Sequence, residues 1–358
     1  MAGLLGILIS SLTSEVSGCG FGTLPGVWVE QHDLPEQSGT IADILIEGLP
    51  IWTPLDQQCQ LEPLLLQHLQ GAGDMKDGSE AQQHHIGILL FGDSVDYRIA
   101  RTFCNAALGR GLEHMTDDGI ARHHNLTGIC QTPSLTVAKQ HISSASLDGP
   151  YWWDMIFPPV PSITAGIQKF TAMEGGPPDV IMIASNFWDI AALYFHGGQK
   201  FGGTPLEHRI FPQNFMTSWT QNFTTILTHL QESVPEGTLL AYHTEHIPVQ
   251  TTDPGKWETD AYLFQHVAQL NAAGRHVAQS LGFQVVDFEA MAAQLPKDDM
   301  LDDITHPKPD FLLQVLNMLL NIEREHRRQQ HRQSSQQHQH TRATGRVRWM
   351  QPHKGNLG

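Results

Sequence analysis

The sequence predicts an α/β protein: a three-layer α/β/α sandwich around a mostly parallel central sheet, over roughly residues 81–322. Short, continuous apolar runs recur through this region, and such runs are typical of strands buried on both faces. Segments with helical apolar spacing separate the runs, which favours parallel pairing through right-handed crossovers. Ligands of such sheets bind at the carboxyl ends of the strands, so we expect the chemistry just after the apolar runs.

The first element is the run Ile86–Phe91, followed by a helical spacing of apolar residues over 95–108. Residues 109–150 show no clear period. The remaining expected elements, in order, are a helix at 163–173, a strand at 179–184, a helix at 211–234, a strand at 238–242, a helix at 257–281, a strand at 283–288 and a helix that begins near Pro309 and passes Leu320.

Two flanking segments complete the expected organisation. Residues 1–80 are rich in Gly, Pro and Gln and form an irregular extension, with one strand expected near Ile41–Ile46. Residues 323–358 are rich in Gln, His and Arg and have almost no apolar side chains, so they cannot repay the entropy of ordering. The sequence therefore predicts a disordered tail.

Charge excludes several functions. The chain has 358 residues and a formal net charge of −16. The tail holds eight Lys or Arg against two Glu, a net +6, so the rest carries −22. An acidic body argues against nucleic-acid binding. No apolar run reaches the ~18 residues of a membrane span, which excludes a multi-span membrane protein. The basic tail is either a solvated extension or a contact for anionic surfaces.

Three features together favour the secretory route, either secretion or residence in its lumen. The N-terminus is apolar but lacks a preceding basic residue, so it is a signal sequence, a truncated one or a buried segment. Four cysteines allow three disulfide pairings and demand none. Asn125 and Asn222 each begin a glycosylation sequon, which would make the protein a glycoprotein.

The turn Gly92-Asp93-Ser94 is the first candidate site. A strand stops there, Gly permits a sharp turn, and Ser94 stands where the helix begins. This geometry would expose the hydroxyl at the sheet edge and direct the first helical N–H groups at a developing oxyanion. The alternative is that Asp93 or Ser94 only caps the helix.

The segment Asp303-Ile304-Thr305-His306 is the second candidate. A serine nucleophile needs a base, and the base needs an acceptor that orients it. Asp303 and His306, three apart in a turn before a helix, can supply both. The alternative is that Asp303 is a solvated turn residue and His306 one of 21 histidines, many of them at the surface.

The third candidate is Asn186, which follows the apolar run at 179–184. Its amide could donate to an oxyanion, or it could cap the next helix. The order of the three blocks is more informative than any one of them: Ser after one strand, Asn after another, and Asp-x-x-His before the last helix.

This order resembles the SGNH (GDSL-type) hydrolase superfamily. The Gly92-Asp93-Ser94 block, with Pro178-Asp179-Val180-Ile181-Met182 leading to Trp188-Asp189, looks most like its PC-esterase branch, which is related to trichome-birefringence-like O-acetyltransferases. The resemblance implies a catalytic triad of Ser94, Asp303 and His306, and an oxyanion hole of the Ser94 N–H, Asn186 and a glycine. Gly109, Gly111 and Gly128 are candidates for that glycine, and Arg98 is a candidate for an arginine common after the Gly-Asp-Ser turn. The Asn block departs from the usual Gly-x-Asn-Asp.

The resemblance implies a serine-dependent ester hydrolase or O-acyltransferase that acts on a small acyl group, with acetyl on a glycan as the leading expectation. No cofactor is implied, and protein partners are unknown. The alternative is a catalytically inactive module of the same fold that serves in binding or scaffolding. Because His306 must be neutral to act as a base, we expect activity to fall below about pH 6.

Metal catalysis is not expected. The pairs His84-His85 and His123-His124 and the segment His243-x-Glu245-His246 invite a metal interpretation. None has the i, i+4 spacing of a helical His-Glu-x-x-His zinc motif, and the cysteines lack paired CxxC spacing.

Overall fold

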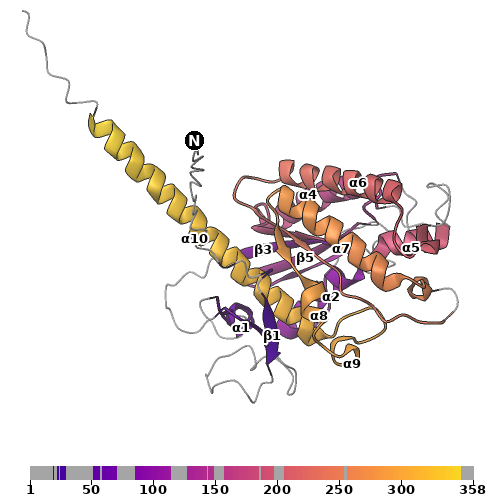
Figure 1. Ribbon diagram of the computed structural model, residues 1–358. Coiled ribbons are helices and arrows are strands. Elements are labelled where there is room, and N and C mark those ends of the chain that lie inside the picture. The colour runs from indigo at the N-terminus through magenta and orange to yellow at the C-terminus, as the bar shows by residue number, and fades with distance from the viewer. Residues whose placement is uncertain are drawn as a thin grey trace, which may run out of the picture.

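The structure is a computed structural model of the chain (Figure 1). It describes residues 19, 22–23, 25–29, 51–56, 59–70, 85–113, 127–142, 144–148, 157–184, 187–196, 205–253 and 256–347, with side chains described as far as 336.

A six-stranded sheet forms the centre, in the order β4-β5-β3-β6-β7-β8. Strand β4 pairs antiparallel with β5, and the other four pairings are parallel. The strands are β3 (Ile86–Gly92), β4 (Gly128–Gln131), β5 (Leu135–His141), β6 (Val180–Ile183), β7 (Leu239–His243) and β8 (Gln284–Val286). The predicted mostly parallel sheet is confirmed.

Helices cover both faces of the sheet, so the predicted three-layer α/β sandwich is confirmed (Figure 1). One layer holds α4 (Pro159–Glu174), α6 (Gln213–Glu232) and α7 (Leu263–Ser280). The opposite layer holds α1 (Leu64–Gln70), α2 (Ser94–Leu108) and α10 (Pro309–Val347). Shorter elements at the rim are α5 (Phe187–His196), α8 (Phe288–Ala292), α9 (Lys297–Met300) and the 3-10 turns Pro205–Glu207 and Trp257–Thr259.

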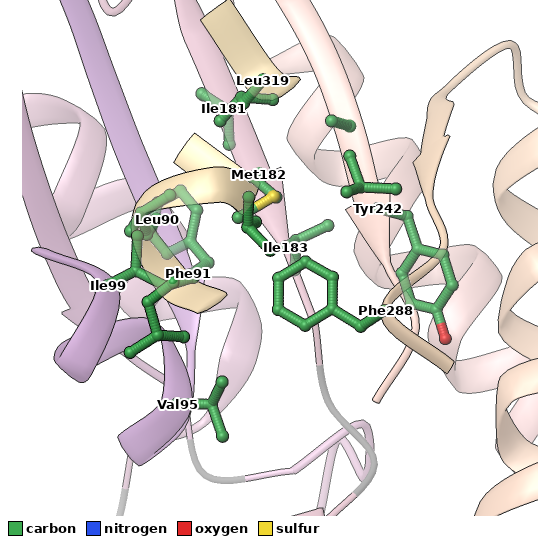
Figure 2. Close-up of a cluster of buried hydrophobic side chains, with 14 of the residues drawn as sticks. Leu90, Phe91, Val95, Ile99, Ile181, Met182, Ile183, Tyr242, Phe288 and Leu319 are labelled. Atoms are coloured by element: carbon green, nitrogen blue, oxygen red, sulfur yellow. The ribbon is translucent and has the colours of Figure 1, made fainter. Parts of the chain in front are cut away.

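The core lies between the sheet and these layers. Figure 2 shows side chains of β3, β6 and β7 gathered with Val95 and Ile99 of α2 and Leu319 of α10. Leu90, Ile181 and Leu319 have no exposed surface. Burying a side chain of this size contributes roughly 1.5–3 kcal/mol. Because the sheet is covered on both faces, its strands read as continuous apolar runs, which is the pattern that revealed most of them.

Two strands lie where the sequence showed no period. Strands β4 and β5 occupy 128–141, and β5 is the neighbour of β3 in the sheet. Every residue of β5 is buried, yet it ends in Lys139, Gln140 and His141. These polar side chains hid the strand from an analysis of apolar runs. The strand expected near Ile41–Ile46 lies outside the described residues.

The N-terminal extension is attached to this core. Strand β1 (Gly26–Val29) pairs antiparallel with β2 (Ile51–Pro54), and Trp52 is a core residue. Two disulfides are formed, Cys19–Cys59 within this extension and Cys104–Cys130 between α2 and β4. The sequence had left the pairing open.

The expectation of disorder from residue 323 was wrong for 323–347, because α10 continues to Val347 (Figure 1). Contacts with the body hold the first turns of this segment. Arg324 pairs with Glu62, and Arg327 pairs with Glu323 and Asp179. The prediction of disorder weighed only the few apolar side chains against the entropy of ordering. It left out these ion pairs, which also stabilise the helix.

Candidate active site

The Gly92-Asp93-Ser94 turn joins β3 to α2, as expected. Asp93 caps the helix: its Oδ1 accepts from the Val95 amide at 2.7 Å, and the Asp93 amide donates to Asp96 Oδ2 at 3.2 Å. This reciprocal capping box fixes the first turn of α2. Ser94 is the first residue of the helix and lies between Asp93 and Val95, whose amides make these two hydrogen bonds. The capping interpretation therefore applies to Asp93 and leaves the Ser94 hydroxyl available.

Gly92 is required by packing in this turn. A Cβ added there would lie 1.8 Å from Asp96 Oδ2, well inside any permitted contact. The Asp96 carboxylate thus occupies the space beneath the turn. Any larger residue would displace that carboxylate and the cap that it forms with the Asp93 amide.

The Asp303–His306 loop folds back on itself before α10. The Asp302 amide donates to the His306 carbonyl at 2.8 Å, which closes the loop. The amides of Thr305 and His306 both donate to Asp303 Oδ1 at 2.8 Å. The His306 Nδ1 lies 2.8 Å from Asp303 Oδ2. Asp303 is therefore held by the backbone and in turn holds the imidazole.

The two segments meet at the carboxyl end of β3. His306 Nε2 lies 2.7 Å from Ser94 Oγ, although the residues are 212 positions apart. Asp303 binds one nitrogen of the ring and Ser94 the other, so the structure brings together all three residues singled out for a triad. The packing of α10 against α2 accounts for the meeting, since each segment begins one of these helices.

The electrostatics of the pair suit a neutral base beside an ionised carboxylate. Burial opposes ionisation of Asp303, but hydrogen bonds from the Thr305 and His306 amides and from the His306 ring bring its pKa down to about 2. Burial lowers the pKa of His306, and the Arg98 guanidinium lowers it further, against the attraction of Asp303. At neutral pH the imidazole is therefore free to accept a proton.

Arg98 reaches the base loop from α2. Its guanidinium donates to Asp302 Oδ2 at 2.7 Å and to Asp303 Oδ2 at 2.9 Å. Arg98 is four residues beyond Ser94, so both side chains face the same side of the helix. The guanidinium thus links the helix that begins with the nucleophile to the loop that holds the base.

The three glycine candidates for the oxyanion hole are not brought to this point. Asn186 lies outside the described residues. Gly109 caps the far end of α2, fifteen residues and about 22 Å from Ser94. Gly111 follows it closely. Gly128 lies in β4, two strands away from β3.

Sequence reasoning did not predict that a group of buried ionisable side chains lies beneath the nucleophile turn. His243, at the end of β7, places Nε2 3.0 Å from Asp96 Oδ1, and both residues are fully buried. Lys139 of β5 places Nζ 3.1 Å from His141 Nδ1, and burial lowers the pKa of Lys139 to about 7. Their positions at the carboxyl ends of two strands were the signal that could have found them.

The metal interpretation of the histidine clusters gains no support. Among the described residues, no group of three or more His, Cys, Asp or Glu side chains is arranged to hold a metal ion. His243 and His246 are both engaged elsewhere, and His84, His123 and His124 lie outside the described residues. None of the described helices is long and apolar enough to cross a membrane.

Comparison with solved structures gives distant structural neighbours. No protein-family model matches the sequence, and no curated protein is similar enough to count as a match. A GDSL-like lipase from Bacteroides thetaiotaomicron is 10% identical, with a TM-score of 0.37, 72% of this chain covered and 94% of that chain. An acetylxylan esterase from Geobacillus stearothermophilus is 15% identical, with a TM-score of 0.34, 68% of this chain covered and 96% of that chain.

Proposed function

We propose that the protein is a serine-dependent ester hydrolase in which Ser94 is the nucleophile, His306 the general base and Asp303 the residue that orients the base. One observation carries the proposal: a continuous hydrogen-bonded chain runs from Ser94 Oγ through the His306 ring to the Asp303 carboxylate, with links of 2.7 and 2.8 Å. That arrangement is what activation of a serine hydroxyl needs.

The proposed reaction has two halves. Ser94 Oγ attacks the acyl carbonyl carbon while its proton passes to His306 Nε2, and the tetrahedral intermediate collapses as the ester oxygen leaves with that proton. Water then attacks the acyl-serine, gives its proton to His306, and releases the carboxylic acid as the proton returns to Ser94 Oγ. Asp303 stabilises the imidazolium at each stage without taking the proton.

We assign stabilisation of the oxyanion to the N-terminus of α2. The Asp93 and Val95 amides are used by the capping box, which leaves the Ser94 amide between them to donate to an oxyanion. The partial positive charge of the helix N-terminus adds to this. We propose Asn186 as a second donor, on its position after β6. One such donor is worth about 3 kcal/mol of transition-state stabilisation.

Water is the proposed acyl acceptor. The His306 and Asp303 side chains expose 22% and 43% of their surface, so solvent reaches the base directly. Transfer to a sugar hydroxyl requires a site that excludes water.

The acyl group is proposed to be small, with acetyl on a glycan as the first substrate to try. This rests on the resemblance of the Gly92-Asp93-Ser94 and Asp303–His306 blocks alone.

We further propose that the protein matures in the secretory route. Two cysteine pairs are bonded, and disulfides persist in oxidising compartments. Of the two sequons, Asn125 lies outside the described residues. Asn222 is half-buried within α6, so Asn125 is the better candidate for a glycan.

A fluorophosphonate probe tests the proposed function. We expect the wild-type protein to be labelled at one serine and to hydrolyse p-nitrophenyl acetate faster than longer-chain esters. Ser94→Ala should abolish labelling and lower turnover by on the order of 10⁴-fold or more. Ser280→Ala, at the end of α7, is the control and should behave as the wild type. Folded wild-type protein that takes no label would refute the hydrolase and favour a non-catalytic module.

A further inference from the structure

The segment His243–His246 lies between the two halves of the site. It begins with the last residue of β7, and all four of its residues have no exposed surface. We propose that this segment is a positioning bracket, in which a doubly protonated His243 holds the nucleophile turn and a neutral His246 holds the base loop. The inference rests on the proposed function, since it assigns positioning residues to the same reaction.

On the nucleophile side, His243 binds the carboxylate that supports the turn. Its Nε2 lies 3.0 Å from Asp96 Oδ1, and the other oxygen of Asp96 accepts from the Asp93 amide. That same carboxylate fills the space beneath Gly92. His243 therefore acts through the Asp96 carboxylate. That carboxylate accepts from the Asp93 amide and lies against Gly92, so it holds the turn that presents Ser94.

The contacts of His243 identify its protonation state. Nδ1 lies 3.0 Å from the Thr244 carbonyl, which can only accept, and Nε2 faces the Asp96 carboxylate. The arrangement in which both oxygens accept from the ring places a hydrogen on each nitrogen. Burial alone would lower the pKa of His243, but the charge and hydrogen bond of Asp96 outweigh it, so that the pKa is raised.

Neighbouring groups are compatible with a buried cation here. Asp93 and Asp96 face His243 from α2, and Lys139 faces these carboxylates from β5. Burial, with the charges of Asp93 and Asp96, raises the pKa of Glu245 well above its usual range and so favours the uncharged carboxyl. Phe288 stacks on the His243 ring, with centroids 4.3 Å apart. The imidazolium thus pairs directly with the Asp96 carboxylate, and a neutral ring would remove that ion pair from a buried site.

On the base side, His246 binds the backbone of the loop itself. Its Nε2 lies 2.5 Å from the Thr305 carbonyl, so this nitrogen carries the hydrogen. Nδ1 is buried and has no partner among the described residues, and burial lowers the pKa of His246 to about 3. Thr305 stands directly before His306, and its own amide donates to Asp303. One neutral ring therefore fixes the peptide between the acid and the base.

The bracket is rigid because its centre is tied to the sheet and to α7. The Thr244 hydroxyl donates to Asp287 Oδ1 at 3.0 Å. The Glu245 amide donates to Asn271 Oδ1 at 2.9 Å, and Asn271 Nδ2 returns a bond of 2.7 Å to the Glu245 carbonyl. Two rings three residues apart can thus hold two segments that are more than 200 residues apart in the chain.

Paired variants separate positioning from folding. His246→Gln keeps an N–H near the Nε2 position, whereas His246→Leu has no donor, and His243→Phe removes both the charge and the donors. We expect His246→Leu and His243→Phe to slow labelling of Ser94 by about 10- to 100-fold, the scale of a misplacement near 1 Å. His246→Gln should stay within about threefold of the wild type. His276→Leu, an exposed position on α7, is the control.

A readout that does not depend on catalysis keeps this inference distinct from the proposed function. Nitrogen-15 NMR of the wild-type imidazoles at pH 7 should show His243 protonated on both nitrogens and His246 protonated on Nε2 alone. Wild-type protein that takes no label but shows these ring states refutes the hydrolase and retains the bracket as a structural device. A neutral His243 ring overturns the bracket, as does labelling of folded His246→Leu at the wild-type rate.

Discussion

Arg98 is the residue whose charge acts on both members of the acid–base pair. Its guanidinium bonds Asp303 and lies close enough to His306 to lower the pKa of that imidazole. A lower pKa keeps the base neutral to a lower pH. The decline of activity on the acid side should therefore have its midpoint below 6.5, the ordinary value for histidine.

Replacing Arg98 should move that midpoint. In Arg98→Gln the nearby positive charge is gone, so protonation of His306 costs less and its pKa rises. We expect the acid limb of kcat/KM, measured on p-nitrophenyl acetate between pH 4 and 8, to shift to higher pH. Arg101→Gln, on the exposed face of α2, should leave the limb in place. If the midpoint of the acid limb were unchanged in Arg98→Gln, the guanidinium would have no electrostatic effect on the base.

Asp303 was predicted from a three-residue spacing, and its surroundings account for its suitability. Two backbone amides and one imidazole converge on its carboxylate. The sequence indicated which residue would orient the base. It did not show that Glu258 and His246 hold the loop by binding Thr305, because those contacts come from segments distant in the chain.

Among the elements, helix α2 is joined covalently to the edge of the central sheet. The disulfide Cys104–Cys130 ties α2 to β4, the edge strand that pairs with β5. The closed loop spans 26 positions. In the chain-entropy account, cross-linking a loop of this size stabilises the fold by about 3–4 kcal/mol, because it removes conformations of the unfolded chain.

Removing this disulfide should lower stability more than reactivity. For Cys104→Ser with Cys130→Ser we expect the free energy of unfolding in urea to fall by about 2–4 kcal/mol. Labelling of Ser94 in the folded protein should stay within about twofold of the wild type, since α2 packs on the core at its other end. Mass spectrometry of the unreduced protein should find the linked peptides. A stability equal to that of the wild type would show that the bond contributes nothing to the fold.

At the scale of the whole molecule, α10 has two parts. Its first turns pack in the layer of α1 and α2 and belong to the core, while its C-terminal part extends beyond the body (Figure 1). Between them, Glu323 is buried and pairs with Arg327. His326 and Gln330 bond the Gly237 carbonyl at 3.2 and 3.1 Å.

Two truncations should separate these parts. The C-terminal part of α10 extends beyond the body (Figure 1), so we expect removal of residues 337–358 to change the free energy of unfolding by less than about 0.5 kcal/mol. Removal from 323 onward also deletes the pairs to Glu62 and Asp179, and it should lower stability by about 1–3 kcal/mol. Urea unfolding measures both. If the shorter deletion lowered the free energy of unfolding more than the longer one, the contacts of residues 323–330 with the body would not be what stabilises this helix.

The sequence alone determined the fold class and three residues of the candidate site. Parallel strands buried on both faces leave continuous apolar runs, and a residue that follows such a run lies at the carboxyl edge of the sheet, so this pattern was sufficient for Ser94. Asp303 and His306 were predicted from their three-residue spacing in a turn before the last helix. Their catalytic roles stay proposals.

Only the tertiary structure decided what lies beneath that edge. Strand β5 was hidden because it buries Lys139 and His141, and the roles of Arg98, His243 and His246 depend on partners far away in the chain. A buried charge is stable only beside a partner. No local pattern encodes that partner, because the fold alone brings the two segments together.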